Sequence, residues 1–351
     1  MNKMLIHMKS AIAIAVASAV VGTSAHAVTF STFVPSSSIN AVEGQNNTIA
    51  FNYAGNKFVG SVYTGPNNLQ LYSTNLSGGN VQKFGAPIPG SFSGEVVLAA
   101  SLGQDSFNKG DIYAGAGAQI YHFSNDVSTQ VLFASVPDGA TVRQILFDPG
   151  SSFGGAMLVT TTLGHVYSFD AAGNATLIAS TGEDTEGMDI APSSWGKYAG
   201  DLLTTSEGSG FIRAITPGGA ITVISSAPVA ETVSVVPDTL NPADPLQGFY
   251  VANYPVDIQF AAAGQFTGIE GDAIVTSEQG SNAQVWDLHY TGDNTPFTIN
   301  LIGNLPNQSE DGIFVTGQRE SEVGVPEPGI IALLGAALAG IRLTTRRRQV
   351  K

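Results

Sequence analysis

The sequence predicts an all-β domain, and a β-propeller of six four-stranded blades accounts for its pattern best. Between residues 28 and 318 there is almost no helical periodicity, and short runs of Val, Ile, Leu, Phe and Tyr are broken by Gly, Asn, Asp and Pro. The same arrangement of such runs recurs along this stretch, as set out below. Hydrophobic residues make up 43% of the chain and charged residues 12%, which is enough apolar material for a large core. A β-helix or a β-sandwich is the alternative fold.

Three segments share one layout of strand, loop, strand, turn, strand, turn and strand. They are Glu95–Phe133, Arg143–Ile178 and Glu186–Ile224, and weaker copies begin at Glu43 and Glu231. Successive starts are separated by 52, 48, 43 and 45 residues. A period near 45 residues with four strands per repeat is typical of propeller blades.

The last part of the domain is expected to complete the ring. Residues Glu270–Ile302 supply the middle and outer strands of one more blade, and Glu310–Gly317 reads as an inner strand that closes the ring with N-terminal strands. Six blades is the best count, with five or seven as alternatives. Strand pairs such as Gly200–Gly219 resemble the six-bladed NHL-repeat and gluconolactonase-like propellers in pattern, without a diagnostic motif.

The N-terminal segment, residues 1–27, has the three parts of a secretory signal peptide. Lys3 and Lys9 form a basic region, Ala11–Val21 is apolar, and Ala25 and Ala27 are the small residues of a cleavage site. We therefore expect export through the Sec translocon. The chain contains no cysteine, so the exported domain is predicted to fold without disulfides.

The C-terminal segment, residues 325–351, also has three parts: a short motif, the apolar run Gly329–Ile341 and a basic cluster. The motif is Pro326, Glu327 and Pro328, and the cluster includes Arg346, Arg347 and Arg348. The run is shorter than the roughly 20 residues that span a bilayer comfortably, and the arginines would stay on the cytoplasmic side. This order resembles the PEP-CTERM sorting signal of Gram-negative bacteria.

The resemblance implies an exosortase-type processing enzyme as partner, with the three motif residues as its recognition site. It further implies transient anchoring in the inner membrane, followed by a place in the cell envelope or outside the cell, where extracellular polysaccharide is an expected partner. Residues 319–324 read as a linker between the propeller, residues 28–318, and this signal. An ordinary membrane anchor is the alternative.

Charge is segregated along the chain. Seven of the fourteen lysines and arginines lie in the two terminal segments, whereas 27 of the 28 acidic residues lie between them. So acidic a domain argues against nucleic acid or an anionic membrane as partner. It suits divalent cations, or simply solubility.

Acidic residues recur near the expected starts of the repeats, and propellers bring such positions together at the central channel. The candidates are Glu43, Glu95, Glu186, Glu231 and Asp311. Converging carboxylates favour Ca²⁺ over Zn²⁺. Arg143 occupies an equivalent position and is expected to pair with a neighbouring acid. The alternative is that all these acids cap loops or form ion pairs.

The sequence contains no complete catalytic constellation, and we assign no catalytic residue. The leading expectation is a non-enzymatic binding or structural protein of the envelope or extracellular matrix. One alternative is a metal-dependent hydrolase or lactonase that uses the channel carboxylates, and another is a coat protein without a specific ligand.

Overall fold

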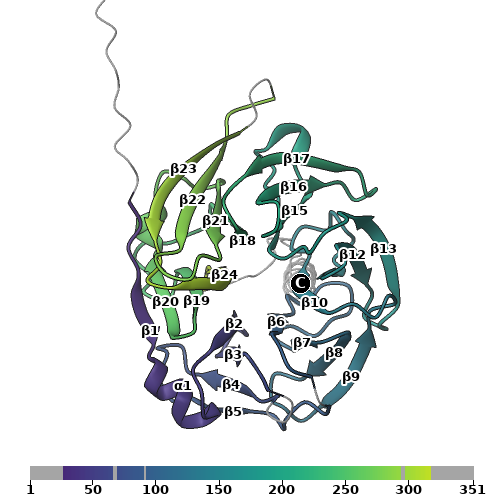
Figure 1. Ribbon diagram of the computed structural model, residues 1–351, viewed down its shortest axis with the longest axis vertical. Coiled ribbons are helices and arrows are strands. Elements are labelled where there is room, and N and C mark those ends of the chain that lie inside the picture. The colour runs from purple at the N-terminus through teal and green to yellow at the C-terminus, as the bar shows by residue number, and fades with distance from the viewer. Residues whose placement is uncertain (1–26, 66–68, 91, 294–296, 318–351) are drawn as a thin grey trace, which may run out of the picture.

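The computed structural model describes residues 27–65, 69–90, 92–293 and 297–317, which form six four-stranded antiparallel sheets arranged as a ring (Figure 1). This is the predicted six-bladed β-propeller. The expected signal peptide and its cleavage site, the linker and the PEP-CTERM-like tail lie outside the described residues. Within the described residues, no helix is long and apolar enough to cross a membrane.

Four blades are built from consecutive strands. The first contains β2 (Thr48–Tyr53), β3 (Phe58–Val62), β4 (Leu71–Thr74) and β5 (Gln82–Phe84); the second β6 (Val96–Ala100), β7 (Ile112–Ala116), β8 (Gln119–Phe123) and β9 (Gln130–Ser135). The third contains β10 (Val142–Phe147), β11 (Met157–Thr161), β12 (His165–Phe169) and β13 (Ala175–Ser180); the fourth β14 (Met188–Ile190), β15 (Leu202–Thr205), β16 (Phe211–Ile215) and β17 (Ile221–Ser226).

The strands of the last two blades are not consecutive in the sequence. The fifth contains β18 (Ala230–Val235), β21 (Ala273–Ser277), β22 (Gln284–Tyr290) and β23 (Phe297–Asn304). The sixth contains β24 (Gln308–Val315), β19 (Gly248–Tyr254), β20 (Asp257–Ala262) and β1 (Ser31–Val34). The chain therefore forms the first strand of the fifth blade, β18, and then the hairpin β19–β20, which belongs to the sixth blade, before it returns to the fifth blade with β21.

This strand order corrects the sequence-based assignment of the final strands. Residues 270–302 were expected to supply the middle and outer strands of one more blade. They do form middle and outer strands, but of the blade that β18 begins: β21 pairs with β18, with Val233 opposite Val275. The predicted closing strand β24 instead pairs with β19, with Tyr250 opposite Ile313. The ring is closed as predicted, by β24 on the inside and the N-terminal β1 on the outside. The inserted hairpin joins these two strands.

Burial along each blade explains the sequence pattern. Inner and middle strands such as β6 and β11 are buried along their whole length, because both faces of each sheet pack against neighbouring blades. Outer strands such as β9 and β17 alternate or are exposed. Six hydrophobic clusters fill the six junctions between blades. All of them are made by residues between Val28 and Val315, so this segment contains the core of the described protein.

In the part of the chain that the structure describes, three short helices lie between the strands: α1 (Ser36–Glu43) and the 3₁₀ helices η1 (Gly196–Tyr198) and η2 (Ala263–Phe266). Helix α1 lies on the outer side of the ring (Figure 1), near β4, β5 and β20. It ends at Gly44, whose φ of 73° provides a left-handed cap. The first repeat was expected to start at Glu43, but the innermost strand of that blade begins at Thr48, and Glu43 belongs to this helix.

Candidate functional site

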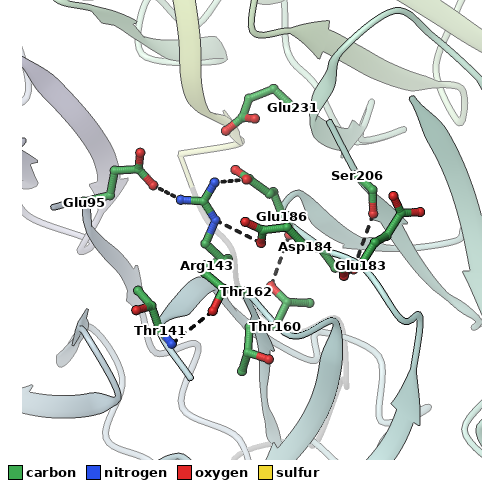
Figure 2. A network of polar contacts seen from close by, with 12 residues as sticks. Glu95, Thr141, Arg143, Thr160, Thr162, Glu183, Asp184, Glu186, Ser206 and Glu231 are labelled. Carbon is green, nitrogen blue, oxygen red and sulfur yellow. Dashed lines mark hydrogen bonds and ion pairs between the residues drawn. The ribbon is translucent and has the colours of Figure 1, made fainter. Parts of the chain in front are cut away.

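The starts of the innermost strands bring acidic side chains together around one arginine (Figure 2). Arg143, on β10, forms ion pairs with Glu95 through Nη1 and with Glu186 through Nη2, and its Nε lies 3.2 Å from Oδ1 of Asp184. The arginine side chain is only 15% exposed. The expectation that Arg143 pairs with a neighbouring acid is confirmed, and its guanidinium contacts three carboxylates.

Three glutamates lie beside this arginine on the fourth and fifth blades. One carboxylate oxygen from each of Glu186, Glu207 and Glu231 lies within 4.8 Å of the others. Glu186 and Glu231 are 5% and 3% exposed, and Glu207, in the turn after β15, is half-buried. Oε2 of Glu231 is buried, and among the described residues no N–H, hydroxyl or cationic group donates to it; the Glu231 carboxyl contacts those of Glu186 and Glu207.

Glu310 on β24 completes the group. Its carboxylate accepts a hydrogen bond of 2.7 Å from Nε2 of Gln308, which also donates to Glu278. The negative charges of Glu95 and Glu186 act on Glu310 across the channel. We call the set of seven side chains the channel-mouth cluster; it comprises Arg143 with Glu95, Asp184, Glu186, Glu207, Glu231 and Glu310.

Hydroxyl groups on neighbouring blades hold the backbone of Glu186 and Glu231 in position by hydrogen bonds to their carbonyl oxygens. Thr160 on β11 donates its hydroxyl to the carbonyl of Glu186, 3.2 Å away, and Thr205 on β15 donates to the carbonyl of Glu231. Ser61 on β3 makes the same contact with Val96, the first residue of β6. A hydroxyl on a second strand thus fixes the start of the next blade's innermost strand at three junctions.

Burial and crowding make these carboxyl groups hard to ionise. Burial raises the pKa of Glu186 to about 7, although Arg143 acts in the opposite direction. Burial, followed by the charge of Glu186, raises the pKa of Glu231 well above its ordinary value. Burial and the charge of Glu95 raise the pKa of Glu310 to about 9. The single arginine therefore does not offset the burial and mutual repulsion of these acids, and part of the cluster keeps its protons near neutral pH.

The effect on Arg143 has the opposite sign. Burial by itself would lower the pKa of this guanidinium, but Glu186 and Glu95 together outweigh burial and raise it. The arginine is accordingly charged at neutral pH.

Two of the five predicted metal-site residues lie elsewhere. Glu43, on α1, lies near Lys83 and Tyr72 on the outer part of the first blade, and burial raises its pKa to about 7. Asp311 accepts hydrogen bonds from the backbone N–H of Phe51, at 3.2 Å, and from Nε2 of Gln144, at 3.3 Å. It therefore ties β24 to β2 and β10 within the channel. The structure brings Glu95, Glu186 and Glu231 to the channel mouth.

Sequence reasoning missed Glu207, because its surroundings read as a plain turn. A signal was present: Thr-Ser-Glu follows the second strand in both the fourth blade, at residues 205–207, and the fifth, at residues 276–278. Comparison of the repeats at this position would have singled out Glu207 and Glu278. Both face the channel side of their blades, where Glu207 meets Glu231 and Glu278 meets Gln308.

The three histidines of the described region each pair with an aspartate. Nε2 of His122 lies 2.7 Å from Asp111, and Nδ1 of His289 lies 2.8 Å from Asp272. His165 pairs with Asp138. All three lie on third strands of their blades, away from the channel-mouth cluster.

Two hollows lie further along the innermost strands. A cavity of about 30 Å³ in the channel is lined by residues of all six blades, among them Gln144, Asp189 and Gly312, and has room for one or two water molecules. A larger pocket of about 440 Å³ lies at the far ends of β2 and β6, between Tyr53 and Lys109.

No protein-family model matches the sequence, and none of the curated proteins compared with it is significantly similar. Similar solved structures include a protein of unknown function from Bacteroides thetaiotaomicron, at 9% identity and a TM-score of 0.49, which covers 79% of this chain and 64% of that one. Virginiamycin B lyase from Staphylococcus aureus is 12% identical, with a TM-score of 0.43, and the match covers 78% of this chain and 88% of that one. A streptogramin B lyase is 13% identical, with a TM-score of 0.41, and the match covers 78% of this chain and 87% of that one. At these identities and TM-scores the likeness transfers no activity to this chain, whose propeller architecture rests on its own sheet topology.

Proposed function

We propose that this chain is an exported, non-enzymatic binding protein of the cell surface, whose channel mouth takes a positively charged ligand. One observation carries the binding half of the proposal: six carboxyl groups gather around a single arginine in the channel-mouth cluster.

The balance of charge in the cluster favours a cation. Arg143 contacts Glu95, Asp184 and Glu186. Among the described residues, no ion pair joins Glu207, Glu231 or Glu310 to a lysine, arginine or histidine. Negative charge that lines one end of a channel attracts cations and repels anions. A positively charged ligand would reduce the electrostatic repulsion between the carboxyl groups that Arg143 alone does not offset.

The export half of the proposal rests on the two terminal segments. The signal-peptide pattern supports passage through the Sec translocon, and the PEP-CTERM-like tail supports recognition by an exosortase-type enzyme. The protein would then be anchored transiently in the inner membrane before it reaches the envelope or the extracellular matrix. Extracellular polysaccharide is the partner we propose for it there.

Fractionation of cells that carry the sorting enzyme tests this half. We expect the wild-type chain in the envelope or the medium, shortened at its C-terminus. A variant with Pro326, Glu327 and Pro328 all changed to Ala should stay in the inner membrane at full length. Equal distribution of the two proteins would refute sorting by this motif.

Titration of the purified full chain with spermidine, a flexible polycation, tests the binding half. We expect binding that weakens with added salt. The variant Glu95→Gln removes one negative charge from the cluster and should weaken the binding further. If neither added salt nor the variant weakens the binding, spermidine binds elsewhere on the protein.

Metal-dependent hydrolysis is the second candidate, because the pKa of Glu186, at about 7, suits a general base at neutral pH. Turnover of simple lactones or esters in the presence of Ca²⁺, abolished by Glu186→Gln, would support it. A null result over such a panel would leave the binding function.

A further inference from the structure

We propose that Glu186, Glu207 and Glu231 together form a binding site for one divalent cation, with calcium as the best fit. This inference rests on the proposed function and specifies its ligand. It concerns only the part of the channel-mouth cluster that Arg143 leaves incompletely paired.

The spacing of the three carboxylates matches a single ion. Their oxygens lie within 4.8 Å of one another. Three oxygens that lie 2.3–2.6 Å from a calcium ion and surround it evenly are about 4.0–4.5 Å apart, so one ion can contact all three glutamates after side-chain shifts of a few tenths of an ångström. The remaining positions in a coordination shell of six to eight oxygens would be filled by second carboxylate oxygens and water.

The surroundings of the Glu231 carboxyl are an independent indication of a ligand. Glu231 is 3% exposed, and among the described residues no N–H, hydroxyl or cationic group donates to its Oε2; its carboxyl contacts those of Glu186 and Glu207. A buried carboxyl group that faces other acids is costly to ionise unless a cation or a proton lies between them. Arg143 does not supply the missing contact, since its three ion pairs go to Glu95, Asp184 and Glu186. A cation between the three glutamates would supply it.

The donor set selects the class of metal. All three side chains offer carboxylate oxygens, which suit hard cations such as Ca²⁺ and Mg²⁺, whereas Zn²⁺ prefers nitrogen and sulfur. The three described histidines lie away from these glutamates, paired with aspartates. Calcium tolerates irregular arrangements of oxygens better than magnesium does.

The backbone around the three glutamates is held before any ion arrives. The N–H of Glu186 donates to the carbonyl of Thr205 at 2.9 Å, and the N–H of Gly187 donates to the carbonyl of Glu231 at 2.9 Å. Gly187 has to be glycine here, because a Cβ would lie 2.6 Å from the Cα of Thr232. Rigid backbone positions of this kind lower the entropy lost when a ligand binds.

Calorimetric titration of CaCl₂ into the chelator-treated full chain tests the inference. We expect one ion per chain, with a dissociation constant of about 10⁻⁴ M, the range of extracellular calcium modules. The thermal unfolding midpoint should rise with calcium concentration, because the ion binds the folded state only.

Isosteric variants locate the site. Glu207→Gln and Glu231→Gln should each weaken calcium binding by about tenfold or more, because each replaces a carboxylate that the ion would hold ionised with a neutral amide. Glu278→Gln is the matched control, since Glu278 occupies the same turn position in the fifth blade but contacts Gln308. The control should keep wild-type affinity. Glu207 is half-buried, so its variant is expected to fold even if Glu231→Gln does not.

The outcomes separate this inference from the broader proposal. Equal calcium affinity in wild type and Glu207→Gln would overturn the assigned site. If calcium fails to bind while spermidine does, the metal site is wrong and the cation-binding mouth stands. If neither binds, both proposals fall.

Discussion

Arg143 should be the most costly charged residue to remove from this propeller. In Arg143→Met the carboxylates of Glu95, Asp184 and Glu186 lose their shared partner while remaining in place. Removing one member of a buried ion pair costs about 3–5 kcal/mol, because the other charge stays buried and unpaired. Only Glu186, at 7% side-chain exposure, is buried to that degree. Asp184 is 39% exposed, and a contact to such a group contributes about 0–1 kcal/mol. We therefore expect a loss near the lower end, about 3 kcal/mol.

Denaturant unfolding of the full chain at pH 7.5, in the presence of chelator, measures this loss. Arg143→Lys is the matched variant, because it keeps the charge and much of the stem but cannot reach three carboxylates with one planar group. It should lose about half as much. If the Met and Lys variants lose the same amount, packing of the stem rather than its charge stabilises the site. A loss below about 1 kcal/mol in the Met variant would show that the carboxylates do not need the arginine.

Three further predictions concern the junctions between blades and the fifth blade. Gly187→Ala should cost about 2 kcal/mol or more in denaturant unfolding, because the new Cβ meets backbone 2.6 Å away, whereas Gly150→Ala, which meets nothing within 4 Å, should cost little. Thr205→Val removes the hydroxyl that holds the carbonyl of Glu231 and should cost about 1 kcal/mol in the same assay; an unchanged midpoint would show that the contact is dispensable. Burial and the neighbouring Asp272 raise the pKa of Asp287 to about 7, so the wild type should lose stability as the pH rises from about 4 to about 7. Asp287→Asn should match the wild type near pH 4 and exceed it by about 1–2 kcal/mol at pH 8, as followed by melting temperature; parallel pH profiles would contradict this.

Much of the fold follows from local pattern. The four-strand repeat with a period near 45 residues gives six blades, because each repeat buries its faces only against its neighbours. The same periodicity places Glu95, Arg143, Glu186 and Glu231 at equivalent positions, and this equivalence brings them together at the channel mouth. These features depend on short-range order in the sequence, so one sequence is enough to reveal them.

Other features depend on pairing across long distances in the chain. The hairpin β19–β20 belongs to the sixth blade because β21 pairs with β18 and β24 pairs with β19. These pairings join strands that are far apart in the sequence, and no local pattern predicts them. Glu43 shows a second limit, since a Glu near a repeat start can end a helix instead of beginning a strand. Glu207 shows a third limit, because the residues that a side chain in a turn contacts depend on how the adjacent blade is placed.

The way the sixth blade is assembled has a consequence for how the protein matures. Its strands come from the beginning, the later middle and the end of the described chain, so the ring cannot close until almost all of that chain has been synthesised. Such non-local pairing is slow. A polypeptide that stops before Gln308 would leave the inner edge of β19 without its partner strand. That open edge would accept β24 from a second, complete molecule, and we expect C-terminally truncated copies to trap intact ones in strand-swapped dimers.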